Sequence, residues 1–137
     1  MTATSDSITG ALDRPVRRVM RHGVVSVPEH ALLESVRRAM TDHQVHAVLV
    51  EERTTGRPLG WVRAESLLTW MNLEHEPVHA HRAITEPVVT IAPDAPLREA
   101  VAALSRHGIS HLLVCGDGDR TAQGVVTALD IVAGWER

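Results

Sequence analysis

The hydrophobic positions along the chain follow one pattern twice. Two short β-rich runs, VVSV (24–27) and VVTI (88–91), are each followed by a stretch whose apolar residues recur at helical spacing. Apolar residues at positions i, i+3, i+4 and i+7 form a single stripe that a helix can bury. Two further β-rich runs and a second helical run follow in each case. The pattern therefore predicts two copies of a β-α-β-β-α unit.

The two copies align at a constant spacing of 64 residues (88 − 24). Residues 24–68 align with residues 88–132 without a gap, so that Leu33 aligns with Leu97 and Gly60 with Gly124. Self-similarity at a constant spacing is the sequence signature of a duplicated structural unit. We conclude that the chain contains an internal tandem duplication.

The elements of each copy can be placed from these patterns. Asp94 is expected to cap the first helix of the second copy and Gly108 to end it, since such residues favour these positions. The second helices are expected to begin at Glu65 and Leu129. The strands between the helices are expected at HAVLVEE and LGWVR, then at HLLVCG and QGVVTA. The buried stripes are expected at Leu33, Val36 and Met40 in the first copy, and at Leu97, Ala100, Val101 and Leu104 in the second.

The fold class expected from these elements is α+β, in two tandem repeats. We expect a flexible N-terminus at 1–12, a first repeat at 13–71, a linker at 72–82 and a second repeat at 83–137. Each small sheet has an apolar face that needs a partner. The repeats should therefore pack face to face about a pseudo-two-fold axis, with two related clefts between them.

Composition narrows the class of protein. The chain has no Phe or Tyr, so the core is expected to consist of Val, Leu, Ile, Ala and Met. A net charge of −3 argues against a dedicated nucleic-acid binder. The single cysteine excludes an internal disulfide and a multi-cysteine metal site. With no signal peptide and no apolar run of about 20 residues, we expect a cytoplasmic protein without a membrane segment.

The junction GVVTALD (124–130) carries the most suggestive polar residues. Thr127 and Asp130 lie where a strand leads into a helix, a place where ligand contacts are common. The first copy reads GWVRAES, with Arg63 and Ser66 in the equivalent positions. The alternative is structural: Thr is a good strand residue, and an Asp favours the first turn of a helix.

The duplication and its terminal corner resemble the CBS-domain pair, also called a Bateman module. The resemblance extends from about Val16 to Trp135 and is most specific in PVVTIAPDAPLREAVAALSRHGISHLLV (87–114) and GVVTALD (124–130). The chain departs from the family where it has HLLV (111–114) instead of the frequent Arg-Leu-Pro-Val, and the first copy is the more divergent. The resemblance implies two tandem CBS repeats.

The resemblance also implies an adenosine-containing ligand, such as AMP, ADP, ATP or S-adenosylmethionine. Asp130 would accept hydrogen bonds from the ribose hydroxyls, and Thr127 would meet a phosphate. Because the first copy has Ser66 and Arg63 at these positions, we expect one competent site and one that is empty or altered. A basic residue from the other repeat would add to the phosphate contacts, with His46 as the candidate and His111 as its counterpart. The adenine would lie against Ile84, Val88, Val89, Ile109 and Ser110.

Two other groups of residues invite a chemical role. His75, His79 and His81 lie close together beside Glu74 and Glu76, but without a known metal-binding spacing a solvated linker surface is favoured and no metal is expected. The basic run Arg14, Arg17, Arg18 and Arg21 fits a solvated face, or alternatively a phosphate entrance or a partner surface.

The chain carries no grouping typical of a catalytic site, so we expect a protein that is not an enzyme and needs no cofactor. The favoured function is a regulatory module, a homodimer that senses an adenosine-containing ligand in an inter-repeat cleft and acts in trans on an unknown protein partner. The alternative is a ligand-free CBS module that serves as a dimerisation scaffold.

Overall fold

The computed structural model describes residues 10–71, 77–116 and 121–134. The chain forms two compact units, which do not follow the chain in simple order. One unit, called here the C-terminal unit, combines the described residues up to Val24 with those from Val89 onward. The other, called the central unit, consists of Val25–Val88.

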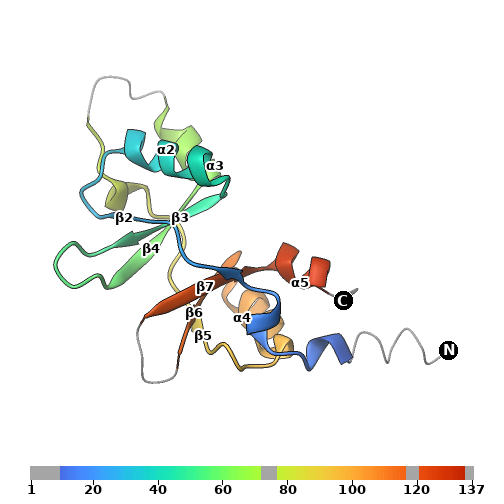
Figure 1. Cartoon of the computed structure of the whole chain (residues 1–137). Coiled ribbons are helices and arrows are strands. Elements are labelled where there is room, and N and C mark those ends of the chain that lie inside the picture. The colour runs from blue at the N-terminus through green and yellow to red at the C-terminus, as the bar shows by residue number, and fades with distance from the viewer. Residues whose placement is uncertain (1–9, 72–76, 117–120, 135–137) are drawn as a thin grey trace. The chain divides into compact units, whose positions relative to one another are not determined.

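The central unit is a three-stranded sheet with helices on one face (Figure 1). The strand order is β2-β3-β4, with β2 parallel to β3 and β3 antiparallel to β4. This is the β-α-β-β-α order predicted for the first copy. Its elements are β2 (Ser26–Pro28), α2 (Leu33–His43), β3 (Ala47–Glu51), β4 (Pro58–Arg63), α3 (Ala64–Trp70) and the 3-10 helix η2 (Ala80–Ala83).

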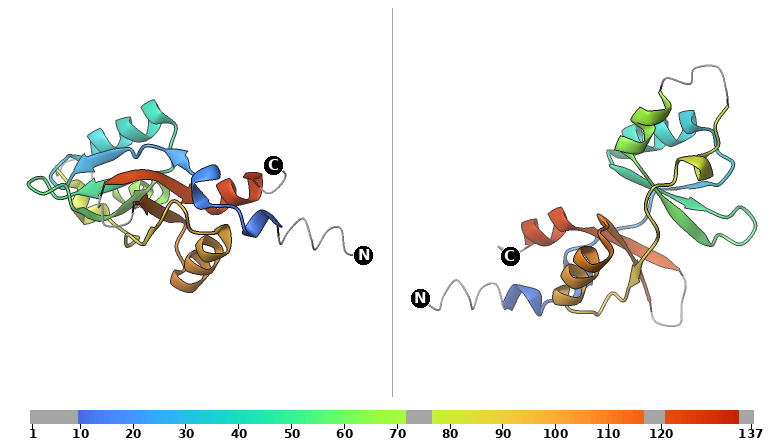
Figure 2. Two further views of the ribbon diagram at one scale, coloured as in Figure 1. Left: turned by 60° about the horizontal axis from the view of Figure 1, so that its bottom comes forward. Right: turned by 180° about the vertical axis from the view of Figure 1, so that it is seen from behind.

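The C-terminal unit repeats this arrangement with one strand more. Its sheet has the order β1-β7-β6-β5, and α4 and α5 lie on the same side of it (Figure 2). The predicted α+β class with two tandem repeats is thus confirmed. The elements are the 3-10 helix η1 (Val16–Arg18), β1 (Arg21–His22), β5 (Thr90–Ile91), α4 (Leu97–His107), β6 (His111–Cys115), β7 (Ala122–Thr127) and α5 (Ala128–Gly134).

The segment that precedes each repeat completes the sheet of the other repeat. Strand β1, ahead of the first copy, pairs with β7 of the second copy, with Arg21 opposite Val125. Residues ahead of the second copy bond to β4 of the first copy in turn: the N–H of Trp61 donates to the carbonyl of Glu86 at 2.9 Å. The 64-residue spacing continues upstream of the aligned repeats, because the bridge between Pro15 and Pro96 has its counterpart 64 residues away in the bridge between His79 and Leu32. At this spacing Arg21 is equivalent to Thr85.

The segments that precede the two repeats are called here the leading segments. Glycine is required where each of them crosses the sheet. A Cβ at Gly124 would collide with the carbonyl oxygen of Arg21, and a Cβ at Gly60 would collide with the side chain of Ile84. Met20, next to Arg21, is equivalent to Ile84, so the two close approaches are the same structural feature. The identity of Gly60 and Gly124 in the two copies follows from this crossing.

Helix α4 ends where the sequence predicts but begins differently. Gly108 ends α4 in the left-handed conformation, and Gln44 takes the same role after α2. The expectation that Asp94 caps α4 is wrong, because the N-cap is Pro96 and no side chain caps the helix. The Asp94 carboxylate instead forms an ion pair with Arg17.

The two cores are mainly aliphatic. In α4, Leu97, Ala100 and Leu104 are buried as predicted, whereas Val101 is 39% exposed and does not belong to the stripe. The prediction of a core without aromatic residues is also incomplete, because Trp61 on β4 is 1% exposed. In the parts of the chain that the structure describes, no helix combines the length and the hydropathy that a membrane crossing needs.

Candidate ligand-binding corner

Thr127 and Asp130 lie at the predicted corner between a strand and a helix. Strand β7 ends at Thr127, and α5 begins at the next residue, Ala128. Gly124, three residues earlier on the same strand, lies against the carbonyl of Arg21. The corner is therefore held between β7, α5 and the leading segment that contains β1.

The two side chains cap the helix reciprocally. The backbone N–H of Asp130 donates to Oγ1 of Thr127 at 3.2 Å, and the backbone N–H of Thr127 donates to Oδ2 of Asp130 at 3.0 Å. This is the geometry of a capping box, which satisfies backbone N–H groups at the start of a helix. The structural interpretation of these residues thus has direct support.

Capping does not exhaust the hydrogen-bonding capacity of the pair. A carboxylate offers about four acceptor positions and a hydroxyl can donate while it accepts. The Asp130 side chain is only 11% exposed, and its Oδ1 lies 3.6 Å from Nε of Arg21. Arg21 itself has a side chain that is 63% exposed. The corner thus presents a shielded carboxylate beside a guanidinium group that solvent reaches.

The equivalent corner of the central unit is chemically different. Ser66, equivalent to Asp130, is buried, and its Oγ lies 2.7 Å from Oγ1 of Thr85. Arg63, equivalent to Thr127, lies 3.6 Å from Oε2 of Glu65 and 3.9 Å from Oε1 of the buried Glu86. Its guanidinium is therefore already beside two carboxylates.

The apolar residues expected to face an adenine divide between the two units. Ile109 is buried in the core of the C-terminal unit, and Val89 is partly buried against the same core. These two belong to the unit that contains Thr127 and Asp130, whereas Ile84 and Val88 belong to the central unit. The structure thus brings only part of the predicted adenine wall into one unit with the corner.

The polar residues named with them also divide between the units. His111 stands opposite Thr127 in the β6–β7 pairing, and Oγ of Ser110 lies 2.7 Å from its Nδ1. His46 is exposed and belongs to the central unit, so its part in the site stays a prediction. At the 64-residue spacing His46 is equivalent to Ser110, and His111 is equivalent to Ala47.

The linker histidines have a partner that the sequence did not indicate. His75, Glu74 and Glu76 lie outside the described residues. The ring of His30, which precedes α2, lies 5.4 Å from that of His79 and 5.7 Å from that of His81, between ring centroids. The signal that could have found His30 is the upstream continuation of the repeat, because it places 79–81 beside the loop before α2.

The basic run of the N-terminal segment is only partly a solvated face. Nη1 of Arg14 donates to the carbonyl of Gly134 at 3.1 Å, and Arg17 pairs with Asp94. Arg21 lies beside Asp130. Arg21 is the residue that sequence reasoning undervalued, because only the exchange of leading segments brings it to the corner.

Comparison with known proteins identifies the duplicated unit. The model of the CBS domain family matches residues 16–73 and again residues 80–135. The two matches together cover most of the chain and coincide with the two copies of the repeat. No curated protein sequence matches the chain.

Solved structures with the same fold are numerous at low sequence identity. The CBS domain of a bacterial CNNM/CorC family Mg2+ transporter, in complex with ATP, is 21% identical with a TM-score of 0.81 over 96% of this chain and 94% of that one. The CBS domain of a CBS domain containing membrane protein from Sphaerobacter thermophilus is 25% identical, with a TM-score of 0.77 and the same coverages. The protein PAE2072 from Pyrobaculum aerophilum, complexed with AMP, is 20% identical, with a TM-score of 0.72 over 85% and 88%.

Proposed function

Because the chain belongs to the CBS domain family and carries two such domains in tandem, we propose that it is a regulatory module that binds an adenosine-containing ligand. The candidates are AMP, ADP, ATP and S-adenosylmethionine. Two structural neighbours were solved in complex with ATP and with AMP. We place the binding in the C-terminal unit, at the corner of Thr127 and Asp130.

The observation that carries the proposal is the environment of the Asp130 carboxylate. One oxygen accepts the Thr127 N–H, and the other faces Arg21 across 3.6 Å. A ribose has two adjacent hydroxyls that donate hydrogen bonds, and an ionised acceptor makes such bonds stronger. The carboxylate retains acceptor positions for both hydroxyls. The exposed guanidinium of Arg21 would add a donor for phosphate oxygens, together with the Thr127 hydroxyl.

Binding at this corner has a direct route to the molecular surface. Asp130 lies in the first turn of α5, and the same helix exposes Leu129 and Val132, which are 68% and 59% exposed. A ligand held by Asp130 therefore acts on the helix that presents an apolar face. A ligand shifts a conformational equilibrium only by its differential affinity for the states. We propose that the position of α5 is what differs, and that a protein partner in the cytoplasm senses it in trans.

The alternative function is a ligand-free dimerisation scaffold, and a specific observation favours it. Leu68 on α3 is 65% exposed, and Val132, its equivalent on α5, is also exposed. Apolar side chains at equivalent positions of both helices are suited to cover each other in a homodimer. The capping box further gives Thr127 and Asp130 a role without a ligand. The homodimer is compatible with either function.

The experiment that tests the proposal separates the carboxylate from the cap. We would titrate AMP, ADP, ATP and S-adenosylmethionine into the protein by isothermal calorimetry, alongside Asp130→Asn and Ser66→Ala. Asn retains an oxygen that can accept the Thr127 N–H but removes the charge, so the fold should be kept. We expect saturable binding of one ligand in the native protein and in Ser66→Ala, and its loss in Asp130→Asn.

The opposite results are equally informative. Binding that is unchanged in Asp130→Asn would exclude the corner as the ribose site. Absence of heat with all four ligands would favour the scaffold. The scaffold would then be examined by light scattering of Leu68→Asp and Val132→Asp, which should become monomeric.

A further inference from the structure

A cluster of three histidines, His30, His79 and His81, lies in the central unit and shares no residue with the corner of Thr127 and Asp130 in the C-terminal unit. One possible ligand nitrogen from each ring lies within 4.8 Å of those of the other two. His30 and His81 are exposed and His79 is half-buried. The cluster therefore has three imidazole donors that converge on one point at the surface.

Backbone hydrogen bonds hold the segments that carry the three rings. The N–H of Ala80 donates to the carbonyl of Ala31 at 2.7 Å, and the N–H of His81 donates to that of Glu29 at 3.1 Å. His79 forms a β-bridge with Leu32. Ala80 is fully buried and anchors the segment between two of the rings. The convergence of the histidines is thus set by paired backbone and not by mobile side chains alone.

The C-terminal unit provides an internal comparison for this backbone arrangement. There the N–H of Val16 donates to Ala95 and that of Arg17 donates to Pro93, at positions 64 residues from the bonds just described. The residues equivalent to His30 and His81 are Asp94 and Arg17, and they form an ion pair. The shared backbone thus brings these two side chains together in both units.

The divergence between the units changes what this place can bind. In the C-terminal unit the charges of Asp94 and Arg17 neutralise each other in an ion pair, whereas His30 and His81 form no such pair with each other. His79, which is equivalent to Pro15, adds a third ring. Neutral imidazole is a good ligand for Zn2+ and related ions, and three histidines with an open fourth position form a known type of zinc site. We propose that His30, His79 and His81 bind a divalent transition-metal ion of the zinc class.

The geometry needs only a small adjustment for such an ion. Zinc–nitrogen bonds are about 2.0–2.1 Å long, so the ligand nitrogens of a tetrahedral site lie roughly 3.4 Å apart. The ligand nitrogens must therefore approach each other by at most a little over 1 Å, within reach of side-chain rotation at a surface. The ion would join the loop before α2 to the segment that begins η2, and so fasten the leading segment of the second repeat to the rest of the central unit.

The test uses the full chain freed of metal with a chelator, and Zn2+ or Co2+ as the probe. We expect about one Zn2+ per chain by calorimetry, visible d–d bands typical of tetrahedral or five-coordinate Co2+, and a higher melting temperature with Zn2+. His30→Gln and His81→Gln should each weaken Zn2+ binding by at least about 100-fold, more than the roughly 10–100-fold cost of losing an outer-shell partner. His43→Gln, at the end of α2 in the same unit, is the matched control and should bind as the native chain does.

A double variant guards against misfolding as the cause of lost binding. His30→Asp with His81→Arg copies the ion pair of Asp94 and Arg17 into the equivalent backbone of the central unit. It should keep the melting temperature of the metal-free protein and lose the response to Zn2+. Zn2+ binding that is retained in this variant, or is equal in His30→Gln and His43→Gln, would overturn the proposal, as would the absence of Zn2+ binding to the native chain.

Discussion

Oδ1 of Asp130 lies 3.6 Å from Nε of Arg21, and this pair occupies the positions that Ser66 and Thr85 occupy in the other unit. One unit thus has two charged groups where the other has two hydroxyls at 2.7 Å. The backbone that brings them together is the same, because the leading segment crosses each sheet at Gly124 or Gly60. The two copies thus share the backbone arrangement, and the side chains at their corners differ.

The capping box predicts a stability effect that is independent of any ligand. Thr127→Ala removes the hydroxyl that accepts the Asp130 N–H at 3.2 Å. Loss of an N-cap side chain costs about 0.5–2 kcal/mol in the free energy of unfolding. Urea unfolding should show this loss for Thr127→Ala and little change for Thr127→Ser, which keeps the hydroxyl. Equal stability of all three proteins would show that the cap contributes nothing.

The crossing of the leading segment predicts that Gly124 does not tolerate a side chain. In Gly124→Ala the new methyl group would collide with the backbone carbonyl of Arg21, which cannot rotate away. Overpacking of this kind costs about 1–3 kcal/mol. Thermal unfolding should show a lower melting temperature than the native protein. Gly10→Ala is the control, because a Cβ there has open space around it, and a comparable loss in both variants would argue against the crossing.

The hydroxyl pair of the central unit predicts a measurable coupling. Ser66 is buried and bonds to the exposed Thr85, so Ser66→Ala should cost about 0.5–1.5 kcal/mol. A double-mutant cycle with Thr85→Val isolates the pairwise contribution. The sum of the two single losses in the free energy of unfolding should exceed the loss in the double variant. Simple additivity would mean that the hydrogen bond does not contribute to stability.

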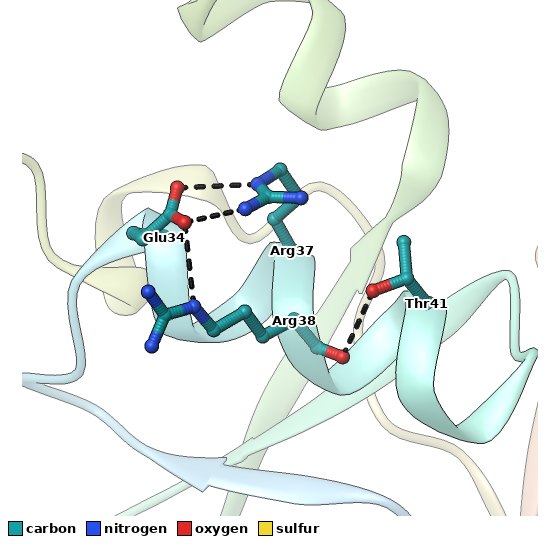
Figure 3. A network of polar contacts seen from close by, with 4 residues as sticks. All are labelled: Glu34, Arg37, Arg38 and Thr41. Atoms are coloured by element: carbon teal, nitrogen blue, oxygen red, sulfur yellow. Dashed lines mark hydrogen bonds and ion pairs between the residues drawn. The ribbon is translucent and has the colours of Figure 1, made fainter.

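The ion pairs of Glu34 with Arg37 and Arg38 on α2 should contribute to the free energy of unfolding in a pH-dependent way (Figure 3). Hydrogen bonds from Arg37 lower the pKa of Glu34 below its ordinary value of 4.5, partial desolvation opposes this, and the charges of Arg37 and Arg38 add to it. A carboxyl whose pKa is lowered by folding stabilises the folded state above its unfolded pKa, and this contribution is lost as the pH falls through the folded pKa.

The matching variant is Glu34→Gln. It should be slightly less stable than the native chain at neutral pH, and the difference should vanish in acid below the folded pKa of Glu34. Because the pair is at the surface, added salt should also reduce the difference. The measurement is the urea midpoint of both proteins across this pH range, at low and high salt. A difference that persists at acid pH would assign the effect to helix propensity.

Much of the fold was accessible from the sequence because it depends on local patterns. The β-rich runs placed β3, β4, β6 and β7, and helical spacing identified the buried residues of α2 and α4. The left-handed φ of 60° at Gly108 follows from its lack of a side chain. Where local reasoning was wrong, at Asp94 and Val101, a tertiary contact or its absence decided the outcome.

The sequence by itself determined the duplication, because the two copies align without a gap at a constant spacing. It also determined the order of elements and the polar pair at the end of β7, since these depend on residues close together in the chain. Only the tertiary structure decided that each leading segment joins the sheet of the other repeat. This exchange also decided which residues lie beside the corner residues. That exchange brings Arg21 to Asp130 across more than a hundred residues, and His79 and His81 to His30. The pairing of a leading segment with a distant strand depends on backbone hydrogen bonds, which nearly any side chain permits. The residue types along the chain therefore did not reveal which segments pair.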